Sequence, residues 1–450
     1  MSLDSQDSLT KDPQPRSSDN YPSLRPGSSS ARRTSAIELI SANEDHLSST
    51  PKSHLSRSRP KDNLPLEASP IASSTITKSK TGVSSHSEEP AQRHRVPSQR
   101  TKASSNNHDE GGGLMNTKNA QFIPVTKLED AQAIRTAEFH PKGKIYAIGS
   151  NSKTLRICEY PKNHELRSLK CDHEPYQPNV LLKKLKHHKG SIYCLSWNGT
   201  GDILATGSND KTIKMMRFDE NRCDFIGNDV ELNMHDGTIR DLCFMDDSAS
   251  RTNVLISGGA GDCKIYITDC ETSTPYQALS GHSGPILSLY TWGGAVFVSG
   301  SQDRTIRFWD IRTRGCVNLI TGPPAPGSSQ GSSVSAVCVD SSGRLLVSGH
   351  EDANCMLYDT RGGRIIQIIR PHESEVRTIR FSPKSYYLLT GGYDGKIILT
   401  DLQGDLTKPT PSIVVAEHKD KVIQGRWHPN DFTFLTTSAD KTAILWSLPN

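Results

Sequence analysis

The chain has 450 residues, a formal net charge of +4 and 34% hydrophobic residues. Lys and Arg are interspersed with Asp and Glu, so no basic stripe indicates a nucleic-acid-binding surface, and no apolar run reaches the roughly 18 residues of a membrane-spanning helix. The opening Met1-Ser2-Leu3-Asp4 lacks the charged and apolar regions of a signal peptide. We therefore expect a cytosolic or nuclear protein that binds no nucleic acid and does not insert into a membrane.

The ten cysteines include no C-x-x-C pair, which argues against a zinc site, and we expect them to be reduced thiols. No phosphate-binding loop, nucleophile motif or cluster of metal ligands is present in the sequence. The sequence therefore predicts a protein that is not an enzyme and that has no cofactor and no metal.

Residues 1–113 differ in composition from the rest of the chain. They are rich in Ser, Pro and Arg, contain no Trp, Phe or Cys, and have Tyr21 as their only aromatic residue. Such a segment cannot bury enough apolar surface to offset the loss of chain entropy, so we expect a disordered tail. Residues 114–450 are expected to form the folded domain.

The segment from Gly281 to Arg312 is the most complete copy of a unit that recurs along this domain. It contains three short predicted strands, begins with Gly-His and has Trp-Asp at the end of its third strand. A sheet this small cannot bury both faces alone, so it needs copies of itself on either side. The turn aspartates of six copies lie 52, 41, 49, 42 and 46 residues apart, which suits four-stranded blades of roughly 40 to 45 residues with insertions. The six other copies span residues 133–160, 191–218, 238–269, 333–359, 375–401 and 421–447.

The Gly-His start, the Ser-x-Asp turn and the Trp-Asp end resemble WD repeats. This resemblance implies an all-β fold, a seven-bladed WD-repeat β-propeller preceded by the disordered tail. It also implies that a His, a Ser or Thr, an Asp and a Trp form a hydrogen-bonded tetrad inside a blade. Two copies match all four positions, namely His282, Ser299, Asp303 and Trp309, and His418, Thr436, Asp440 and Trp446.

The other copies match the tetrad in part. A repeated Asp and His pair could also be taken for an acid-base dyad, but a device present in many blades serves the blades, so a structural role is favoured. In the first copy Ser152 replaces the Asp, and we expect that blade to rely on packing alone. The partial sets are His188, Thr206 and Asp210 with Met216; His372, Thr390 and Asp394 with Thr400; His235 and Asp262 with Gly258 and Thr268; and Ser348 and Asp352 without a His.

The last copy ends after its third strand, so its outer strand must come from elsewhere. Phe122 to Leu128 is a strand-like run that belongs to no copy, and we expect it to close the seventh blade and remove an open edge. Three insertions, Pro161 to Pro178, Asp246 to Asn253 and Thr321 to Ser332, are expected to be variable loops outside the repeats.

The candidate binding residues occupy the position just after the first apolar residue of each first strand, which in this fold faces the central mouth. One interpretation pairs the three arginines among them with local carboxylates such as Glu138, Asp241 and Glu375. The other is a mouth that binds an acidic or phosphorylated peptide. The seven residues are Arg135, Tyr193, Arg240, Leu287, Ser335, Arg377 and Ile423.

Longer strings of this domain are similar to the propellers of the nemitin family of WD-repeat proteins. That resemblance implies a protein-interaction scaffold that is cytoplasmic and associated with microtubule-associated proteins or the microtubule cytoskeleton. The family carries amino-terminal helical dimerisation modules that residues 1–113 do not resemble, so the oligomeric state stays open. The strings are YAIGSNSKTLRICEYP, KHHKGSIYCLSW, MHDGTIRDLCFM, GAGDCKIYITDC, EDANCMLYDTRGGRIIQ, DLQGDLTK and EHKDKVIQGRWH.

An alternative function follows from Trp309-Asp310-Ile311-Arg312. This string matches the W-D-x-R ending shared by substrate receptors of cullin-type ubiquitin ligases. The alternative is therefore a ligase substrate receptor, and identification of captured partners would distinguish it from a cytoskeletal scaffold.

Overall fold

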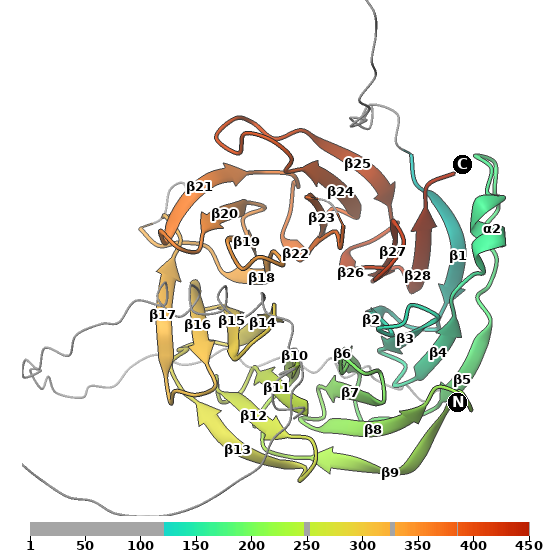
Figure 1. Cartoon of the computed structure of the whole chain (residues 1–450), viewed down its shortest axis with the longest axis horizontal. Helices are drawn as coiled ribbons and strands as arrows, with labels where there is room; N and C mark the ends of the chain where they lie inside the picture. The colour runs from blue at the N-terminus through green and yellow to red at the C-terminus, as the bar shows by residue number, and fades with distance from the viewer. Residues whose placement is uncertain (1–120, 247–252, 325–328, 385, 450) are drawn as a thin grey trace, which may run out of the picture.

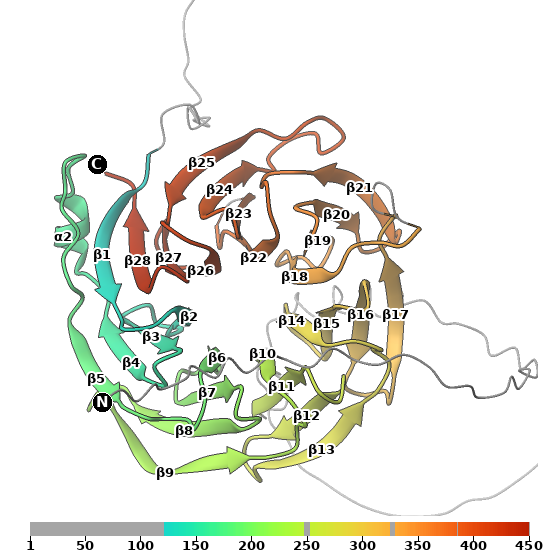
Figure 2. The ribbon, with the colours of Figure 1, turned by 180° about the vertical axis from the view of Figure 1, so that it is seen from behind.

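Seven four-stranded antiparallel sheets stand around a central axis in the computed structural model, which describes residues 121–246, 253–324, 329–384 and 386–449 (Figure 1). In blades 1 to 6 the chain runs from the innermost strand outward, and the blades follow one another around the ring in chain order, as both views show (Figure 2). The predicted all-β, seven-bladed propeller is confirmed.

The four strands of each blade follow one another from the axis outward. Blades 1 to 3 consist of β2–β5 (Ile134–Phe139, Ile145–Ser150, Leu155–Glu159, Val180–Lys184), β6–β9 (Ile192–Trp197, Ile203–Ser208, Ile213–Asp219, Asp224–Leu232) and β10–β13 (Ile239–Asp246, Asn253–Gly259, Ile265–Asp269, Thr274–Leu279). Blades 4 to 6 consist of β14–β17 (Ile286–Thr291, Val296–Ser301, Thr305–Asp310, Cys316–Thr321), β18–β21 (Val334–Val339, Leu345–His350, Cys355–Asp359, Arg364–Ile369) and β22–β25 (Val376–Phe381, Tyr387–Gly392, Lys396–Asp401, Ser412–Glu417). Blade 7 consists of β26–β28 (Val422–Trp427, Thr433–Ser438, Thr442–Ser447) and β1 (Ile123–Glu129).

The second strand of each blade is buried along nearly its whole length because the neighbouring blades cover both of its faces. The blades approach so closely there that a Cβ atom on Gly149 would lie 2.6 Å from Cγ2 of Ile192 in the next blade. Side chains would therefore force the blades apart at this position. The same close approach recurs at Gly207, Gly258, Gly300, Gly349 and Gly391.

The two ends of the domain meet in blade 7. β1 pairs antiparallel with β28, from Ile123 opposite Ser447 to Glu129 opposite Thr442. Next to this strand the ring of Phe122 lies 4.8 Å from that of Phe434. The last three strands of the chain thus obtain their outer strand from the beginning of the domain.

The insertion after β4 packs along β1. It contains the short helix α2 (Asn163–Arg167), and Tyr176 forms a bridge with Thr126. The Lys127 amide donates a hydrogen bond of 2.9 Å to the Tyr176 carbonyl, and Leu169 is buried in the same core cluster as Val125. This insertion therefore covers part of the outer edge of β1 and does not extend freely.

The expected disordered tail of residues 1–113, and the domain boundary after it, lie outside the described residues. The other two insertions are described only in part, because residues 247–252 and 325–328 also lie outside them.

Candidate functional site

A β-bulge lies at the second residue of the first strand in every blade. In each first-to-second strand pair the register shifts across this residue, so that it is skipped in the pairing. A bulge re-aims the side chain that it carries. The seven bulged residues are Arg135, Tyr193, Arg240, Leu287, Ser335, Arg377 and Ile423, the same seven that the sequence places at the mouth.

Six of these side chains line one hollow at the axis, which we call the mouth. The hollow has a volume of about 40 Å³, which is room for water but not for a peptide side chain. A ligand would therefore lie over its rim. Ser335 does not line it, because this residue is buried and its hydroxyl lies 2.6 Å from the Val376 carbonyl oxygen. The six lining residues are Arg135, Tyr193, Arg240, Leu287, Arg377 and Ile423.

Tyr193 lies between two of the mouth arginines. The guanidinium carbon of Arg135 is 4.3 Å from its ring centroid and that of Arg240 is 5.4 Å away. Arg135 donates an Nε hydrogen bond of 2.6 Å to Asn151. Arg377 donates through Nη1 to the carbonyl oxygen of Ser335 at 3.0 Å. These neutral contacts orient the arginines and leave their charges uncompensated.

The local carboxylates do not pair with these arginines. Glu138 forms its ion pair with Arg426, and Asp241 accepts the Leu289 amide at 2.7 Å. Glu375 makes no ion pair in the described part of the chain. Within the described residues none of the three mouth arginines has a carboxylate within ion-pair distance. The interpretation of local pairing therefore finds no support in the geometry.

Burial at the mouth changes the acidity of its charged groups. Burial first, and then the nearby charges of Arg377 and Arg135, lower the pKa of Arg240. The Nε of Arg240 is also buried without a hydrogen-bond partner among the described residues. Burial raises the pKa of Glu375, although the Arg377 charge opposes this shift. An anion over the rim would relieve the repulsion among the arginines.

Two further arginines, which the sequence analysis did not single out, lie deeper along the axis. Arg380 and Arg426 stand three residues after the bulge in β22 and β26 and line the same hollow. Arg426 pairs with Glu138, while Arg380 lies 5.3 Å from the ring centroid of Tyr290. An inspection of the residue three positions after each bulge would have identified both arginines, because this position again faces the axis.

The tetrad of blade 4 is complete. Nδ1 of His282 lies 2.8 Å from Oδ2 of Asp303, and Nε2 lies 2.6 Å from the Ser299 hydroxyl, which also accepts the Trp309 indole N–H at 2.8 Å. Because the Asp303 carboxylate only accepts, Nδ1–H of His282 donates to it, and the Ser299 hydroxyl accepts from Trp309 and donates its own proton to Nε2. Burial would raise the pKa of Asp303, but the hydrogen bonds from His282 and Thr305 outweigh it and lower the pKa.

Blade 7 repeats this arrangement. His418 lies 2.9 Å from Asp440 through Nδ1 and 2.8 Å from Thr436 through Nε2. The indole N–H of Trp446 donates to the same Thr436 hydroxyl at 2.8 Å. In both blades the histidine side chain is fully buried, so these groups connect a loop to a turn inside the blade and are out of reach of a substrate.

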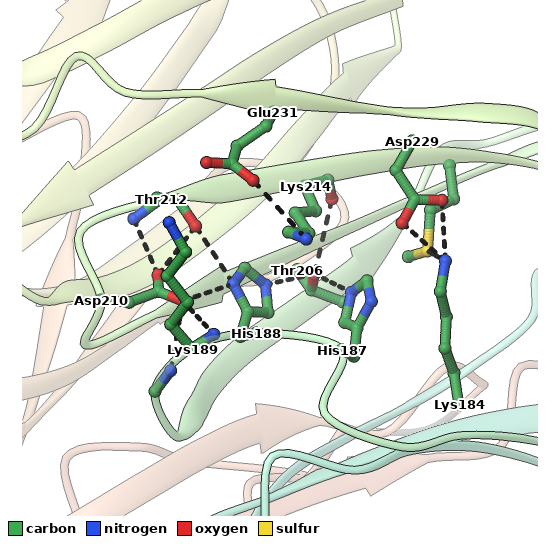
Figure 3. Close-up of polar contacts among 12 residues, drawn as sticks. Lys184, His187, His188, Lys189, Thr206, Asp210, Thr212, Lys214, Asp229 and Glu231 are labelled. Atoms are coloured by element: carbon green, nitrogen blue, oxygen red, sulfur yellow. Dashed lines mark hydrogen bonds and ion pairs between the residues drawn. The ribbon is translucent and has the colours of Figure 1, made fainter.

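Blade 2 places two histidines on one hydroxyl. His187 and His188 each have Nε2 2.9 Å from the Thr206 hydroxyl, and Nδ1 of His188 lies 3.1 Å from Asp210 (Figure 3). Thr206 has one proton to donate, so one histidine accepts it and the other donates to the oxygen. If His188 donates to Asp210, then His187 donates to Thr206, and its buried Nδ1 is a lone pair without a partner among the described residues.

Two of the partial tetrads differ from the sequence interpretation. In blade 3 the hydroxyl partner of His235 is Ser257 at 2.9 Å, one residue before the expected Gly258, and Nδ1 of His235 is 3.6 Å from Asp262. In blade 5 a histidine is present after all, because Nε2 of His350, on the strand itself, lies 2.7 Å from the Ser348 hydroxyl. The interpretation failed because it required the histidine to come from the loop before the first strand.

Blade 1 does not rely on packing alone, so that expectation was wrong. Asp130, which lies directly after β1, accepts hydrogen bonds from the hydroxyls of Ser150 at 2.8 Å and Ser152 at 3.0 Å. It also forms an ion pair of 2.5 Å with Arg156, and both side chains are buried. Burial would raise the pKa of Asp130, but these bonds outweigh it and lower the pKa. Asp130 thus takes the place of the missing turn aspartate from the opposite side of the turn.

We expect the tetrads to act in stability. Asp303→Ala or Asp440→Ala leaves a buried histidine without its carboxylate partner, and the free energy of unfolding should fall by about 1 to 3 kcal/mol. Chemical denaturation measures the change, with Asp420→Ala, an exposed aspartate on the same face, as the control. A tetrad variant that kept its stability but lost partner binding would contradict this role.

Arg312 of the W-D-x-R string is engaged within the string. Its guanidinium makes hydrogen bonds of 2.7 to 3.2 Å to both oxygens of Asp310, which is buried.

Among the described residues, no group of three or more His, Cys, Asp or Glu side chains could hold a metal ion. No helix in the same part of the chain has the length and apolar character needed to cross a membrane.

Comparison with known proteins identifies the repeats. The family model of the WD domain, G-beta repeat, matches residues 179–215, 273–310, 325–359, 363–401 and 410–447. Five WD40 repeats are present. They cover the inner strands of blades 2, 4, 5, 6 and 7. The three inner strands of blades 1 and 3 are not matched. In blade 1 Asp130 takes the place of the turn aspartate, and in blade 3 the His235 to Asp262 distance is 3.6 Å.

The relatives of this WD-repeat chain are distant. It is 24% identical to Protein tipD of Dictyostelium discoideum over 62% of this chain and 43% of that protein. It is 24% identical to nuclear distribution protein nudF of Aspergillus niger over 60% and 62% of the two chains. It is 23% identical to autophagy-related protein 16 of Arabidopsis thaliana over 60% of this chain and 50% of that protein. The matched part of the WD-repeat chain thus corresponds to about half of each relative, and WD-repeat propellers generally act as interaction scaffolds.

Proposed function

We propose that the protein is a cytoplasmic scaffold whose propeller mouth binds acidic or phosphorylated segments of microtubule-associated proteins. The observation that carries this proposal is the set of three half-buried mouth arginines, Arg135, Arg240 and Arg377, which have no carboxylate partner among the described residues. Uncompensated guanidinium groups favour carboxylate or phosphate ligands, which they can bind in bidentate fashion. Tyr193 adds an aromatic surface between two of them.

The class of partner rests on the similarity of the repeat strings to the nemitin family. The names of the distant relatives mention nuclear distribution and autophagy, so what they share with this chain is the propeller and not one process. Binding of proteins or peptides is a general role of WD40 propellers. Association with microtubule-associated proteins is the finer part of the proposal, and it needs a test of its own.

The triple variant Arg135→Ala, Arg240→Ala and Arg377→Ala tests the mouth. We expect it to fold normally and to bind a fluorescein-labelled glutamate-rich peptide or phosphoserine peptide more than tenfold less tightly, because each charge-assisted hydrogen bond is worth about 1.5 to 3 kcal/mol. Wild-type affinity should decrease as salt is added. Fluorescence anisotropy measures both effects.

A matched control removes the same charge elsewhere. The control replaces three exposed arginines by alanine, at or next to the turns between the third and fourth strands: Arg222, Arg314 and Arg364. These turns lie at the end of the third strands that is away from the turns between second and third strands. This variant should bind as wild type. Unchanged binding by a well-folded mouth variant would refute the proposal. Mass spectrometry of proteins captured by wild type but not by the mouth variant identifies the partner class: cytoskeletal proteins support it, whereas ligase adaptor subunits support the receptor alternative.

A further inference from the structure

The turn between the second and third strands has a residue with a positive φ in every blade. Glycine adopts a positive φ freely, whereas residues with a Cβ atom are strained in this conformation. Gly395 has this position in blade 6, so the turn accepts glycine. In four blades the strained residue is a cation, and three of those blades, 7, 1 and 2, are consecutive. The seven residues are Lys153 (φ 64), Lys211 (φ 72), Cys263 (φ 53), Arg304 (φ 70), Ala353 (φ 71), Gly395 (φ 81) and Lys441 (φ 74).

These turns lie beside the mouth. The first residue of the blade 1 turn, Asn151, bonds both the backbone before β2 and the side chain of Arg135. The turns also contact the loop that enters the next blade, since the His187 amide donates to the Lys153 carbonyl at 2.9 Å and the Asp130 amide donates to the Lys441 carbonyl at 2.9 Å. The lysines of blades 7, 1 and 2 therefore form one continuous sector of this face.

The sector has a strong excess of positive charge. Within the described residues none of its seven exposed lysines forms an ion pair. The carboxylates of Asp130, Asp210 and Asp440 are already held inside the blades, and Glu129 pairs with Lys127. Two exposed carboxylates beside these lysines, Asp420 and Glu417 at the end of β25, form no ion pair among the described residues, so positive charge still predominates. The lysines are Lys153, Lys186, Lys189, Lys211, Lys419, Lys421 and Lys441.

Blades 5 and 6, which precede this sector around the ring, carry acidic residues on the same face. Glu351 begins the corresponding turn of blade 5, and Glu373 and Glu375 lie in the loop that enters blade 6. Glu373 pairs with Lys396 at 3.2 Å, while Glu351 and Glu375 form no ion pair in the described part of the chain. These carboxylates would repel an acidic ligand from blades 5 and 6.

We propose that the ligand is an extended segment rich in Asp and Glu that begins at the mouth arginines and continues outward over the lysine turns of blades 7, 1 and 2. This inference rests on the proposed function, and it adds the direction and the length of the bound segment. A side chain that is strained, exposed and without an ion pair contributes little to the fold, whereas three of them in adjacent blades provide a row of charges for further carboxylates of the same ligand.

The test replaces the three strained lysines by glycine, as Lys153→Gly, Lys211→Gly and Lys441→Gly. Because glycine fits a positive φ, the variant should melt at or near the wild-type temperature. The probes are fluorescein-labelled polyglutamates of four and of twelve residues. We expect affinity for the twelve-residue probe to fall about tenfold, with a weaker dependence on salt, and affinity for the four-residue probe to stay unchanged. The control Lys144→Gln, Lys183→Gln and Lys408→Gln, which removes three charges elsewhere, should bind both probes as wild type.

The outcomes separate this inference from the proposed function. If the glycine variant binds the long probe as wild type while the mouth variant does not bind it, the ligand stays at the mouth and the inference is wrong. If the mouth variant binds both probes as wild type, the proposed function itself fails. Tighter binding of a twelve-nucleotide oligothymidylate than of the twelve-residue polyglutamate would assign the sector to nucleic acid and overturn the inference.

Discussion

A chain that begins at residue 131 is expected to lose most of the stability of the propeller, whereas a chain that begins at residue 111 should keep it. The longer deletion removes β1, whose Ile123, Val125 and Leu128 are buried, together with the buried Phe122. Each such side chain contributes about 1.5 to 3 kcal/mol through burial, and their sum is comparable with the whole net stability of a typical domain. The longer deletion also exposes the edge of β28, with which β1 pairs.

Thermal unfolding followed by circular dichroism measures this difference, and the chain that starts at residue 111 is the matched control. Val125→Asp in the full chain is a second route to the same effect, because it places a charge in the fully buried centre of β1 without shortening the protein. Equal melting temperatures for the two truncated chains would show that β1 does not close the ring.

The fold could be predicted from the sequence because each blade repeats the same buried second strand and the same turn. One repeat predicts the strands of a blade, and the next repeat predicts the blade that packs against it, since each blade packs on copies of itself. A glycine recurs in the second strands, as at Gly149, and this repetition is visible in the sequence. The structure explains it, because a Cβ atom there would collide with Ile192 of the next blade. The packing of the insertion on β1 could not be predicted, because Tyr176 and Thr126 carry no repeat signal.

The polar groups of the blades were predictable only where they came from the usual positions. His282 and Asp303 occupy those positions, but Asp130 reaches the blade 1 network from the end of β1, and His350 comes from the strand that it stabilises. In both cases a group from another part of the backbone occupies the same space. A pattern of fixed sequence offsets cannot detect such a replacement, although the buried charge of Arg156 required a carboxylate from somewhere.

At the mouth the sequence predicted the positions but not the contacts. The sequence identified one residue per first strand, each at a bulge, and six of these seven side chains line the hollow. Which carboxylates they would meet depends on the neighbouring blade: Glu138 meets Arg426 of blade 7 and not Arg135 of its own strand. Ser335 is turned away from the hollow, a detail of side-chain orientation that residue type does not specify.

Lowering the pH from 7 to 4 is expected to destabilise the propeller strongly. Burial lowers the pKa of His187, to about 2, so the folded protein keeps this ring neutral while the unfolded chain binds a proton below about pH 6.5. The stability that this group contributes is complete above pH 6.5 and is lost as the pH falls toward 2. By pH 4 the loss from His187 alone is about 3 kcal/mol. Burial also lowers the pKa of His140, His188, His235, His350, His372 and His428.

The carboxylates act in the same direction at lower pH. Burial would raise the pKa of Asp210, but hydrogen bonds from the Thr212 hydroxyl and from the Thr212 and Gly190 amides outweigh it and lower this pKa to about 2. Its contribution is present above about pH 4 and is lost as the pH falls through 2. Urea unfolding at each pH from 7 to 4 measures the combined slope, and His187→Gln should reduce that slope by about one proton. His164→Gln, at an exposed histidine, is the matched control. An unfolding free energy that stayed constant from pH 7 to 4 would contradict the buried, neutral state of these histidines.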